Sequence, residues 1–243
     1  IIDAVYDLVP IVKLQIAFYE LLGSKGVEAF EKTLRYAESK GLLTIADAKR
    51  NDVGHTAEAY AEAFLGSGVF NADSVTVTPY LGWDSVKPFV EVARKQGKGV
   101  FVLVKTSNQS SVDLQDLEMK DGNRVFEIMG HYVESWGAMD IGDSGYSLVG
   151  AVVGATFPDQ ARKLRKIMPN SFLLVPGYGA QGGSIEGVKA CLNDDGHGAV
   201  INNSRAILFA YEGSDTFGPK QYAEAARSAA IKMNEEINSV RNI

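Results

Sequence analysis

The sequence contains little of what several classes of protein require. Its 243 residues include a single cysteine, Cys191, which excludes an internal disulfide framework and favours a reducing compartment. No apolar run approaches the roughly 18 residues that span a bilayer, and Ile1 and Ile2 lead directly into charged Asp3 without a signal peptide. We therefore expect a cytoplasmic protein that has no membrane partner.

The sequence also contains fewer positively charged residues than negatively charged ones. The 24 Lys and Arg residues are outnumbered by 30 Asp and Glu residues, which leaves a net charge of −6. Such an acidic chain is a poor candidate for binding nucleic acid, so local groups must hold any anionic ligand. The three histidines, His55, His131 and His197, lack the spacing of metal ligands. We expect neither a nucleic-acid partner nor a metal site.

Short β-branched runs alternate with amphipathic stretches along the whole chain. The expected strands cover residues 9–18, 42–46, 74–78, 99–104, 148–153, 172–176 and 199–203. The expected helices cover residues 27–39, 56–66, 84–96, 124–137, 159–168, 184–193 and 219–238. This alternation is typical of parallel βαβ units. Since no linker interrupts it, we predict one domain over residues 1–243.

The position of the glycine-rich segment distinguishes two α/β architectures. A doubly wound sheet carries its nucleotide-binding turn after the first strand, whereas the glycines of residues 176–183 follow the penultimate expected strand. Barrels often hold phosphate in the loops after strands seven and eight. We therefore predict a (β/α)₈ TIM barrel. Because the chain opens at Ile1 in a pattern like the end of a helix, we expect it to be N-terminally incomplete and to lack the first strand.

A cluster of charged residues follows the strand expected at 42–46. Strand alternation places Ile45, Asp47 and Lys49 on one face, which in a barrel points into the active-site mouth. Carboxylates at Asp47 and Asp52 would keep the lysine charged and hold it in place. The alternative interpretation is a solvated charge cluster on a loop.

A lysine also interrupts the first apolar run. Residues 10, 12, 14, 16 and 18 form a wholly apolar face that suits packing against helices, so Lys13 and Gln15 should face the barrel interior. A charge inside a strand is costly unless it is paired, and Asp47 on the neighbouring strand is the natural partner. The alternative is an edge strand with Lys13 in water.

Two loops near the C-terminus suggest a phosphate site. Glycines within residues 176–183 allow backbone N–H groups to approach an anion, and a helix begins directly after them. Arg205 follows the last expected strand and offers a planar fork to a phosphate. Taken separately, these features are also compatible with a flexible loop and an ordinary loop arginine. The polar segment 105–122 is either a lid or plain surface.

Together these motifs resemble the orotidine 5′-phosphate decarboxylases, in particular their longer-chain bacterial branch. The segments that carry the resemblance are VKLQIAFYE (12–20), DAKRNDVGHTAEAYAEAFL (47–65), PYLGWDS (79–85), VLVKTSN (102–108), VGAVVGAT (149–156), VPGYGAQGG (175–183) and NNSRAILFAY (202–211). They extend over nearly the whole chain in the family's order.

The resemblance implies a barrel that converts orotidine 5′-monophosphate to uridine 5′-monophosphate and CO₂ in de novo pyrimidine biosynthesis, without metal or cofactor. It implies that Lys49 protonates carbon 6 of the pyrimidine, that Asp47 lies beside the substrate carboxylate, and that Lys13 completes the charged network. Asp52, accompanied by Thr56, would enter the neighbouring subunit's site, which implies a homodimer. The family's first strand carries an aspartate and a lysine for which this sequence has no match.

The resemblance also implies which residues hold the nucleotide. Ser107 corresponds to the residue that touches the pyrimidine, and Gln181 and Arg205 correspond to phosphate contacts. The substrate-binding residues that we predict are Thr56, Ser107, Pro176, Gln181, Gly182, Ser204 and Arg205.

Two other functions remain open at this point. One is an Mg²⁺-dependent sugar-phosphate decarboxylase or aldolase of the same barrel superfamily, which shares the D-x-K-x-x-D pattern. Lys13 argues against it because an ammonium would repel the metal. The other is a non-catalytic phosphate-binding barrel.

Overall fold

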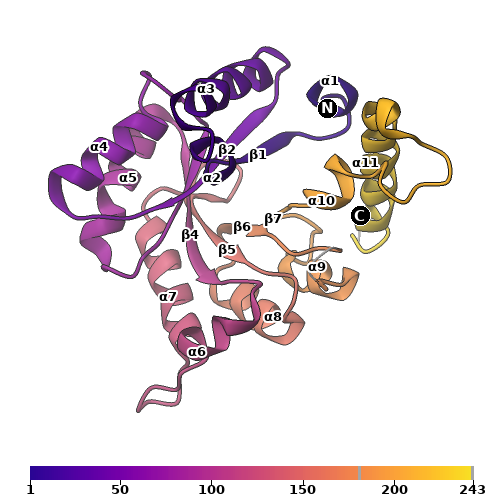
Figure 1. Cartoon of the computed structure of the whole chain (residues 1–243). Helices are drawn as coiled ribbons and strands as arrows, with labels where there is room; N and C mark the ends of the chain where they lie inside the picture. Colours follow the sequence, from indigo (N-terminus) through magenta and orange to yellow (C-terminus); the bar gives the residue numbers. More distant parts are fainter. Residues whose placement is uncertain (180–181, 242–243) are drawn as a thin grey trace.

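The sheet confirms the predicted fold class. The computed structural model describes residues 1–179 and 182–241. Seven parallel strands lie in sequence order, and each pairs with the next along the chain. The sheet curls, and the helices surround its outer face (Figure 1).

Every expected strand and helix is present. The strands are β1 (Ile11–Gln15), β2 (Leu43–Arg50), β3 (Ser74–Val77), β4 (Gly99–Lys105), β5 (Ser147–Val153), β6 (Ser171–Val175) and β7 (Ala199–Ile201). The longer helices are α3 (Gly23–Ser39), α4 (Gly54–Leu65), α5 (Trp83–Gln96), α7 (Val125–Gly137), α8 (Pro158–Ile167), α9 (Ile185–Cys191) and α11 (Tyr222–Asn238). The shorter ones are α1 (Ile2–Val5), α2 (Ala17–Glu20), α6 (Val112–Gln115) and α10 (Arg205–Leu208), with 3₁₀ turns η1 (Gln109–Ser111) and η2 (Pro219–Gln221).

The first strand is shorter than its sequence pattern indicates. The apolar alternation predicts a strand through residue 18, but β1 ends at Gln15 and α2 begins at Ala17. The side chain of Gln15 accepts a hydrogen bond from the backbone N–H of Ala17 (3.2 Å). This local bond offers the backbone an alternative to the sheet and turns the chain into a helix.

Two apolar layers lie on opposite faces of the sheet. One contains strand residues such as Leu14 together with helix residues such as Phe30 and Leu164, so it is the layer between the sheet and its helices. The other is built by strand residues alone, among them Ile45 and Phe101, and it fills the inner face. The predicted inward face of β2 is therefore confirmed, because Ile45 lies in the inner layer.

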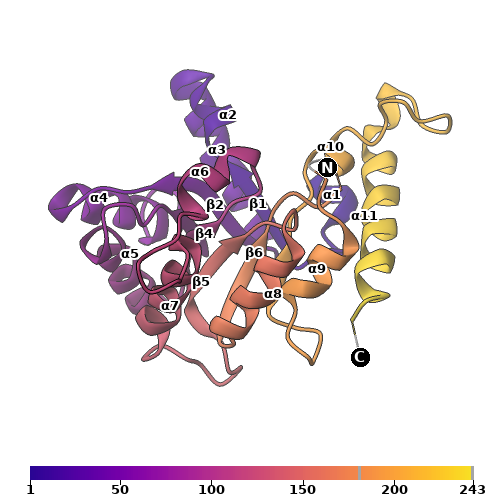
Figure 2. The same cartoon turned by 90° about the horizontal axis from the view of Figure 1, so that it is seen from below.

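Parallel pairing brings the carboxyl ends of all the strands to one edge. Figure 2 shows α2, α6 and α10, which follow β1, β4 and β7, along the same side of the molecule.

The two ends of the described chain also meet: Arg227 of α11 forms a bidentate ion pair with Asp7 (2.6 and 2.8 Å). Across the described residues, none of the helices has the length and apolar character needed to cross a membrane.

Candidate active site

A carboxylate at the carboxyl end of β2 is the centre of a charged network. Asp47 accepts hydrogen bonds from Lys13 Nζ (2.6 Å) and Gln15 Nε2 (3.0 Å) at Oδ2. At Oδ1 it accepts from Lys49 Nζ (2.5 Å) and Thr76 Oγ1 (3.0 Å). An ionised carboxylate offers about four acceptor positions, so these donors saturate it.

Strand register explains how the network assembles. Gln15 lies opposite Asp47 in the β1–β2 pairing, and Lys13 lies two residues before Gln15 on the same face. Lys13 therefore points inward, as predicted, and the alternative in which it lies in water is wrong: its side chain is 12% exposed and pairs with Asp47. With two ammonium groups and one carboxylate, the cluster carries one net positive charge, which suits an anionic ligand.

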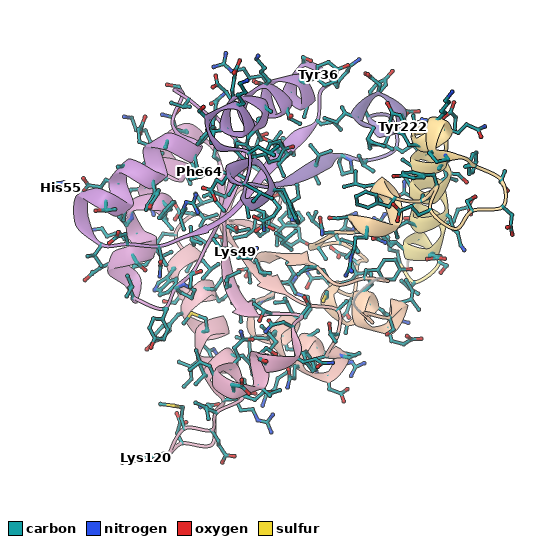
Figure 3. The ribbon with its side chains drawn as sticks, in the orientation of Figure 1. Tyr36, Lys49, His55, Phe64, Lys120 and Tyr222 are labelled. Atoms are coloured by element: carbon teal, nitrogen blue, oxygen red, sulfur yellow. The ribbon has the colours of Figure 1, made fainter. Side chains whose placement is uncertain are left out.

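Lys49 adopts an unusual backbone conformation. Its φ is +47°, in the left-handed region that non-glycine residues rarely occupy. The β2–β3 register shifts between Ala46 and Arg50, so the strand bulges at this point. The side chain remains 43% exposed while it contacts Asp47. Figure 3 shows Lys49 near the middle of the ring of elements and His55 at its outer edge.

The environment of Asp47 favours its ionised form. Burial acts to raise the pKa of this carboxyl, but the Lys13 and Lys49 ammonium groups and their hydrogen bonds outweigh burial and hold the pKa below its ordinary value. Asp47 therefore keeps its negative charge across the physiological pH range.

Arg50 anchors the end of the strand beside the network. Its guanidinium donates to the carbonyl of Ala48 (3.2 Å) and pairs with Glu20 of α2. It also lies 5.5 Å from the ring centre of Tyr60 and 5.7 Å from that of Phe64, both on α4. This side chain connects β2, α2 and α4 just after Lys49, a role that the sequence analysis did not identify.

Two predicted site residues lie outside the network. Asp52 is half-buried, and its Oδ1 accepts a hydrogen bond from the backbone N–H of Val53 (2.8 Å). Thr56 is exposed in the first turn of α4. Within the described residues, neither bonds to the side chains around Asp47.

The glycine-rich loop after β6 folds back on itself. The N–H of Gly183 donates to the carbonyl of Gly177 (2.9 Å), and Gly177, Gly179 and Gly182 all have positive φ. Only glycine adopts such angles readily, so the loop requires these residues. Pro176 leads into the loop, and its carbonyl accepts a hydrogen bond from Ala155 (3.1 Å). Gln181, a predicted phosphate contact, lies outside the described residues.

The loops after β6 and β7 lie next to each other. Gly179 and Asn203 line one pocket together with Ala206 of α10. Ser204 and Arg205 lie at the start of α10, and both are exposed. The structure therefore brings the described members of the two predicted phosphate loops to the same edge as Lys49.

The start of segment 105–122 packs on the barrel, whereas residues 117–122 are exposed and Lys120 lies at the tip of a projecting turn (Figure 3). Lys105 is fully buried, and its Nζ donates to Ser111 (3.0 Å) and Asp116 (2.9 Å). The half-buried Ser107 lies directly against Gly154, where an added Cβ would come within 2.8 Å of the Ser107 Cα. Glycine at 154 is thus what allows Ser107 to sit at the carboxyl end of β4.

Thr76 is the residue of the network that the sequence analysis missed. The run SVTVT reads as a buried strand, and nothing in it marks one hydroxyl as different from another. The available signal was the alternation that places Thr76 two residues beyond Ser74, on the strand next to Asp47.

The chain is similar to known proteins along nearly its whole length. Residues 1–216 match the model of the "Orotidine 5'-phosphate decarboxylase / HUMPS family". Orotidine 5′-phosphate decarboxylases of Clostridium tetani and Rhodopirellula baltica are 46% and 47% identical to it; each alignment covers 98% of this chain and 81% of the relative. The crystal structure of a putative orotidine 5′-phosphate decarboxylase from Streptomyces avermitilis superposes with a TM-score of 0.84 at 37% identity, covering 100% of this chain and 80% of that one.

Proposed function

Because the chain belongs to the orotidine 5′-phosphate decarboxylase / HUMPS family, we propose that its network of Lys13, Asp47 and Lys49 is the catalytic centre of an orotidine 5′-phosphate decarboxylase. The reaction converts orotidine 5′-monophosphate to uridine 5′-monophosphate and CO₂ in pyrimidine biosynthesis. The observation that carries the assignment of the centre is the Lys49 ammonium, held by Asp47 at the carboxyl edge of the sheet.

Lys49 supplies the proton that the reaction consumes. When the bond between carbon 6 and the carboxylate breaks, CO₂ leaves and the electron pair stays on carbon 6. A fixed ammonium stabilises that developing charge and then donates its proton to the same carbon. The neutral amine that remains is 43% exposed and regains a proton from water. Substrate plus one proton thus gives uridine 5′-monophosphate plus CO₂.

Asp47 has two roles in this proposal. Its carboxylate accepts a hydrogen bond from the Lys49 ammonium and so aims that group. It also lies beside the substrate carboxylate, so two negative charges approach each other in the ground state and separate as CO₂ forms. Interactions that improve toward the transition state accelerate the chemical step.

The remote end of the substrate is held by its phosphate. The glycine loop around Gly182, with Pro176 before it, would surround the phosphate, and Ser204 and Arg205 add a hydroxyl and a positive charge. Ser107 contacts the pyrimidine. Binding energy from the phosphate can be used to orient the ring against Lys49.

The positions of Asp52 and Thr56 support a homodimer. Large apolar side chains are exposed on α2, directly after it and on the loop after β3: Phe18 (72%), Leu21 (81%) and Tyr80 (76%). These loops flank the one that carries Asp52, because β1, β2 and β3 are neighbours in the sheet. An exposed apolar patch of this kind favours a protein interface. A second copy covering it would receive Asp52 and Thr56 at its own active site. We place this homodimer in the cytoplasm, as expected for a chain with one cysteine.

Turnover of orotidine 5′-monophosphate, with and without a chelator, tests the function. We expect uridine 5′-monophosphate to form at the same rate in both conditions, since Lys13 already bonds the Asp47 oxygen that a divalent cation would need. No turnover of orotidine 5′-monophosphate, together with Mg²⁺-dependent turnover of a sugar phosphate, would favour a metal-dependent enzyme of the superfamily. Binding of the nucleotide without turnover would favour a non-catalytic barrel.

A further inference from the structure

The hydroxyl of Thr76 bridges two parts of the catalytic network. Its Oγ1 lies 3.0 Å from Asp47 Oδ1 and 2.9 Å from the backbone nitrogen of Lys49. The side chain is buried, with 1% of its surface exposed, on the strand next to Asp47. Water is therefore excluded from both bonds.

The chemistry of the two partners sets the direction of each bond. The backbone N–H of Lys49 can only donate, so the hydroxyl oxygen accepts there. The single hydroxyl proton is then available to Asp47, which must accept it as a carboxylate. The Thr76 side chain thus favours the ionised form of Asp47, and it also holds the backbone of Lys49 by accepting its N–H.

Lys49 needs such a bond because its backbone is unfavourable. A residue with a side chain at φ +47° persists only where its surroundings hold it. The β2–β3 ladder passes from the pair Ala46 and Val75 directly to the pair Arg50 and Val77, so the intervening residues bulge out of the ladder. The Thr76 hydroxyl supplies the acceptor for the Lys49 N–H within that bulge.

We propose that Thr76 is a positioning residue, which couples the Asp47 carboxylate to the left-handed backbone of Lys49 and so fixes where the ammonium points. This inference rests on the proposed function. Without the hydroxyl, the Lys49 N–H loses its acceptor and Asp47 Oδ1 loses one of its two donors. The ammonium then samples positions away from carbon 6, while the phosphate loops remain intact.

The inference predicts a loss in kcat more than in KM. We expect Thr76→Val, which keeps the shape and removes the hydroxyl, to lower kcat by about 10- to 100-fold with KM within about threefold of the parent. Thr76→Ser, which keeps the hydroxyl and removes the methyl group, should restore kcat to within about threefold. If Thr76→Val does not fold, Thr76→Cys makes the same comparison with a weak donor.

Thr44 provides a matched control at the other end of the barrel. It is 2% exposed, and its hydroxyl donates to Asp73 Oδ2 (2.8 Å) and accepts from the Asp73 N–H (3.1 Å). Thr44→Val should therefore lose comparable bonds and leave kcat within about twofold. An unchanged kcat in Thr76→Val, an equal loss in both valine variants, or a failure of Thr76→Ser to recover would each overturn the inference.

Amide hydrogen exchange separates this inference from the proposed function. We expect the Lys49 amide to exchange at least about tenfold faster in Thr76→Val than in the parent, and to be unchanged in Thr44→Val. Unaltered exchange in Thr76→Val would overturn the inference whether or not the parent is active. A parent that does not convert orotidine 5′-monophosphate would overturn the proposed function while the exchange result still decides the role of Thr76.

Discussion

The two ends of the sheet contain the same kind of Thr–Asp contact and use it differently. At the amino end, Asp73 accepts bonds from the backbone N–H and the hydroxyl of Thr44, both at 2.8 Å. At the carboxyl end, Asp47 accepts from Thr76 and also from two lysine ammonium groups. Neutral donors make the first contact a link between strands, whereas the added charges make the second a centre that can act on an anion.

The geometry of parallel strands explains why the chemistry lies at one end only. The segments after the carboxyl ends include α2, the glycine loop and α10, and they meet at one edge. Charged side chains placed there can act on one ligand together. At the amino end, Lys98 donates a hydrogen bond to the uncharged side chain of Asn71 (2.7 Å), and burial lowers the pKa of its ammonium group.

Replacing a lysine at each end is the strongest way to test this contrast. We expect Lys49→Ala to lower kcat by at least about 1,000-fold while nucleotide binding stays measurable, because the proton donor is lost and the phosphate loops remain. Lys98→Ala should leave kcat within about twofold. Steady-state turnover gives kcat for each variant, and a titration with uridine 5′-monophosphate measures nucleotide binding. A kcat for Lys49→Ala within about tenfold of the parent, or roughly 1.4 kcal/mol, would show that its assigned role is wrong.

Mixing two inactive variants sharpens the comparison across the proposed dimer. Asp52→Ala and Lys49→Ala are each expected to lack activity, because each removes one residue of a shared site. Heterodimers would contain one site without both residues and one complete site. With random exchange of equal amounts, activity should return to up to about a quarter of the parent's. No recovery despite demonstrated subunit exchange would mean that Asp52 serves its own chain or that the sites are not independent.

Arg205→Ala tests whether the edge formed by the carboxyl ends of the strands also binds phosphate. The loss of a charge-assisted fork should cost about 2–4 kcal/mol in kcat/KM for orotidine 5′-monophosphate. For the substrate analogue that lacks the phosphate, kcat/KM should be nearly the same in the variant and the parent. Measuring kcat/KM for both compounds in the parent and the variant decides the point, and an equal loss for the two would place Arg205 away from the phosphate.

The smallest expected effect is at the amino end. Asp73→Ala removes the acceptor of two Thr44 bonds and should lower the free energy of unfolding by about 1–3 kcal/mol, with kcat within about twofold of the parent. Thermal unfolding should show a fall of a few degrees, on the order of 2–4 °C per kcal/mol. A large loss of kcat in the folded variant would contradict the view that the amino end of the sheet serves stability and the carboxyl end serves catalysis.

Local pattern was sufficient to predict most of the fold. The alternation of β-branched runs and helical stretches predicted all seven strands, and the apolar face around Leu14 predicted the inward direction of Lys13. These signals are local because side chains alternate along a strand whatever lies around it. The end of β1 was not predicted, since a side-chain bond from Gln15 to the next turn ended the strand early.

Only part of the candidate site could be predicted from local sequence patterns. Lys13, Asp47 and Lys49 could be placed on one face by their spacing, and the glycine loop and Arg205 could be placed after the last two strands. Thr76 was not identified, because strand alternation gives only the direction of its side chain, and its hydroxyl acquires partners only when β3 lies beside β2. Lys105, two residues before the predicted Ser107, points instead into a buried contact with Asp116.

The sequence by itself determined the order of strands and helices, the inner and outer faces of β1 and β2, and the types of residue at the carboxyl edge. Those properties depend on spacing and on the chemistry of single side chains. Only the tertiary structure decided that four donors converge on Asp47 and that Lys49 adopts a left-handed backbone. Both depend on the register between neighbouring strands, which brings together side chains that lie about 30 residues apart in the chain.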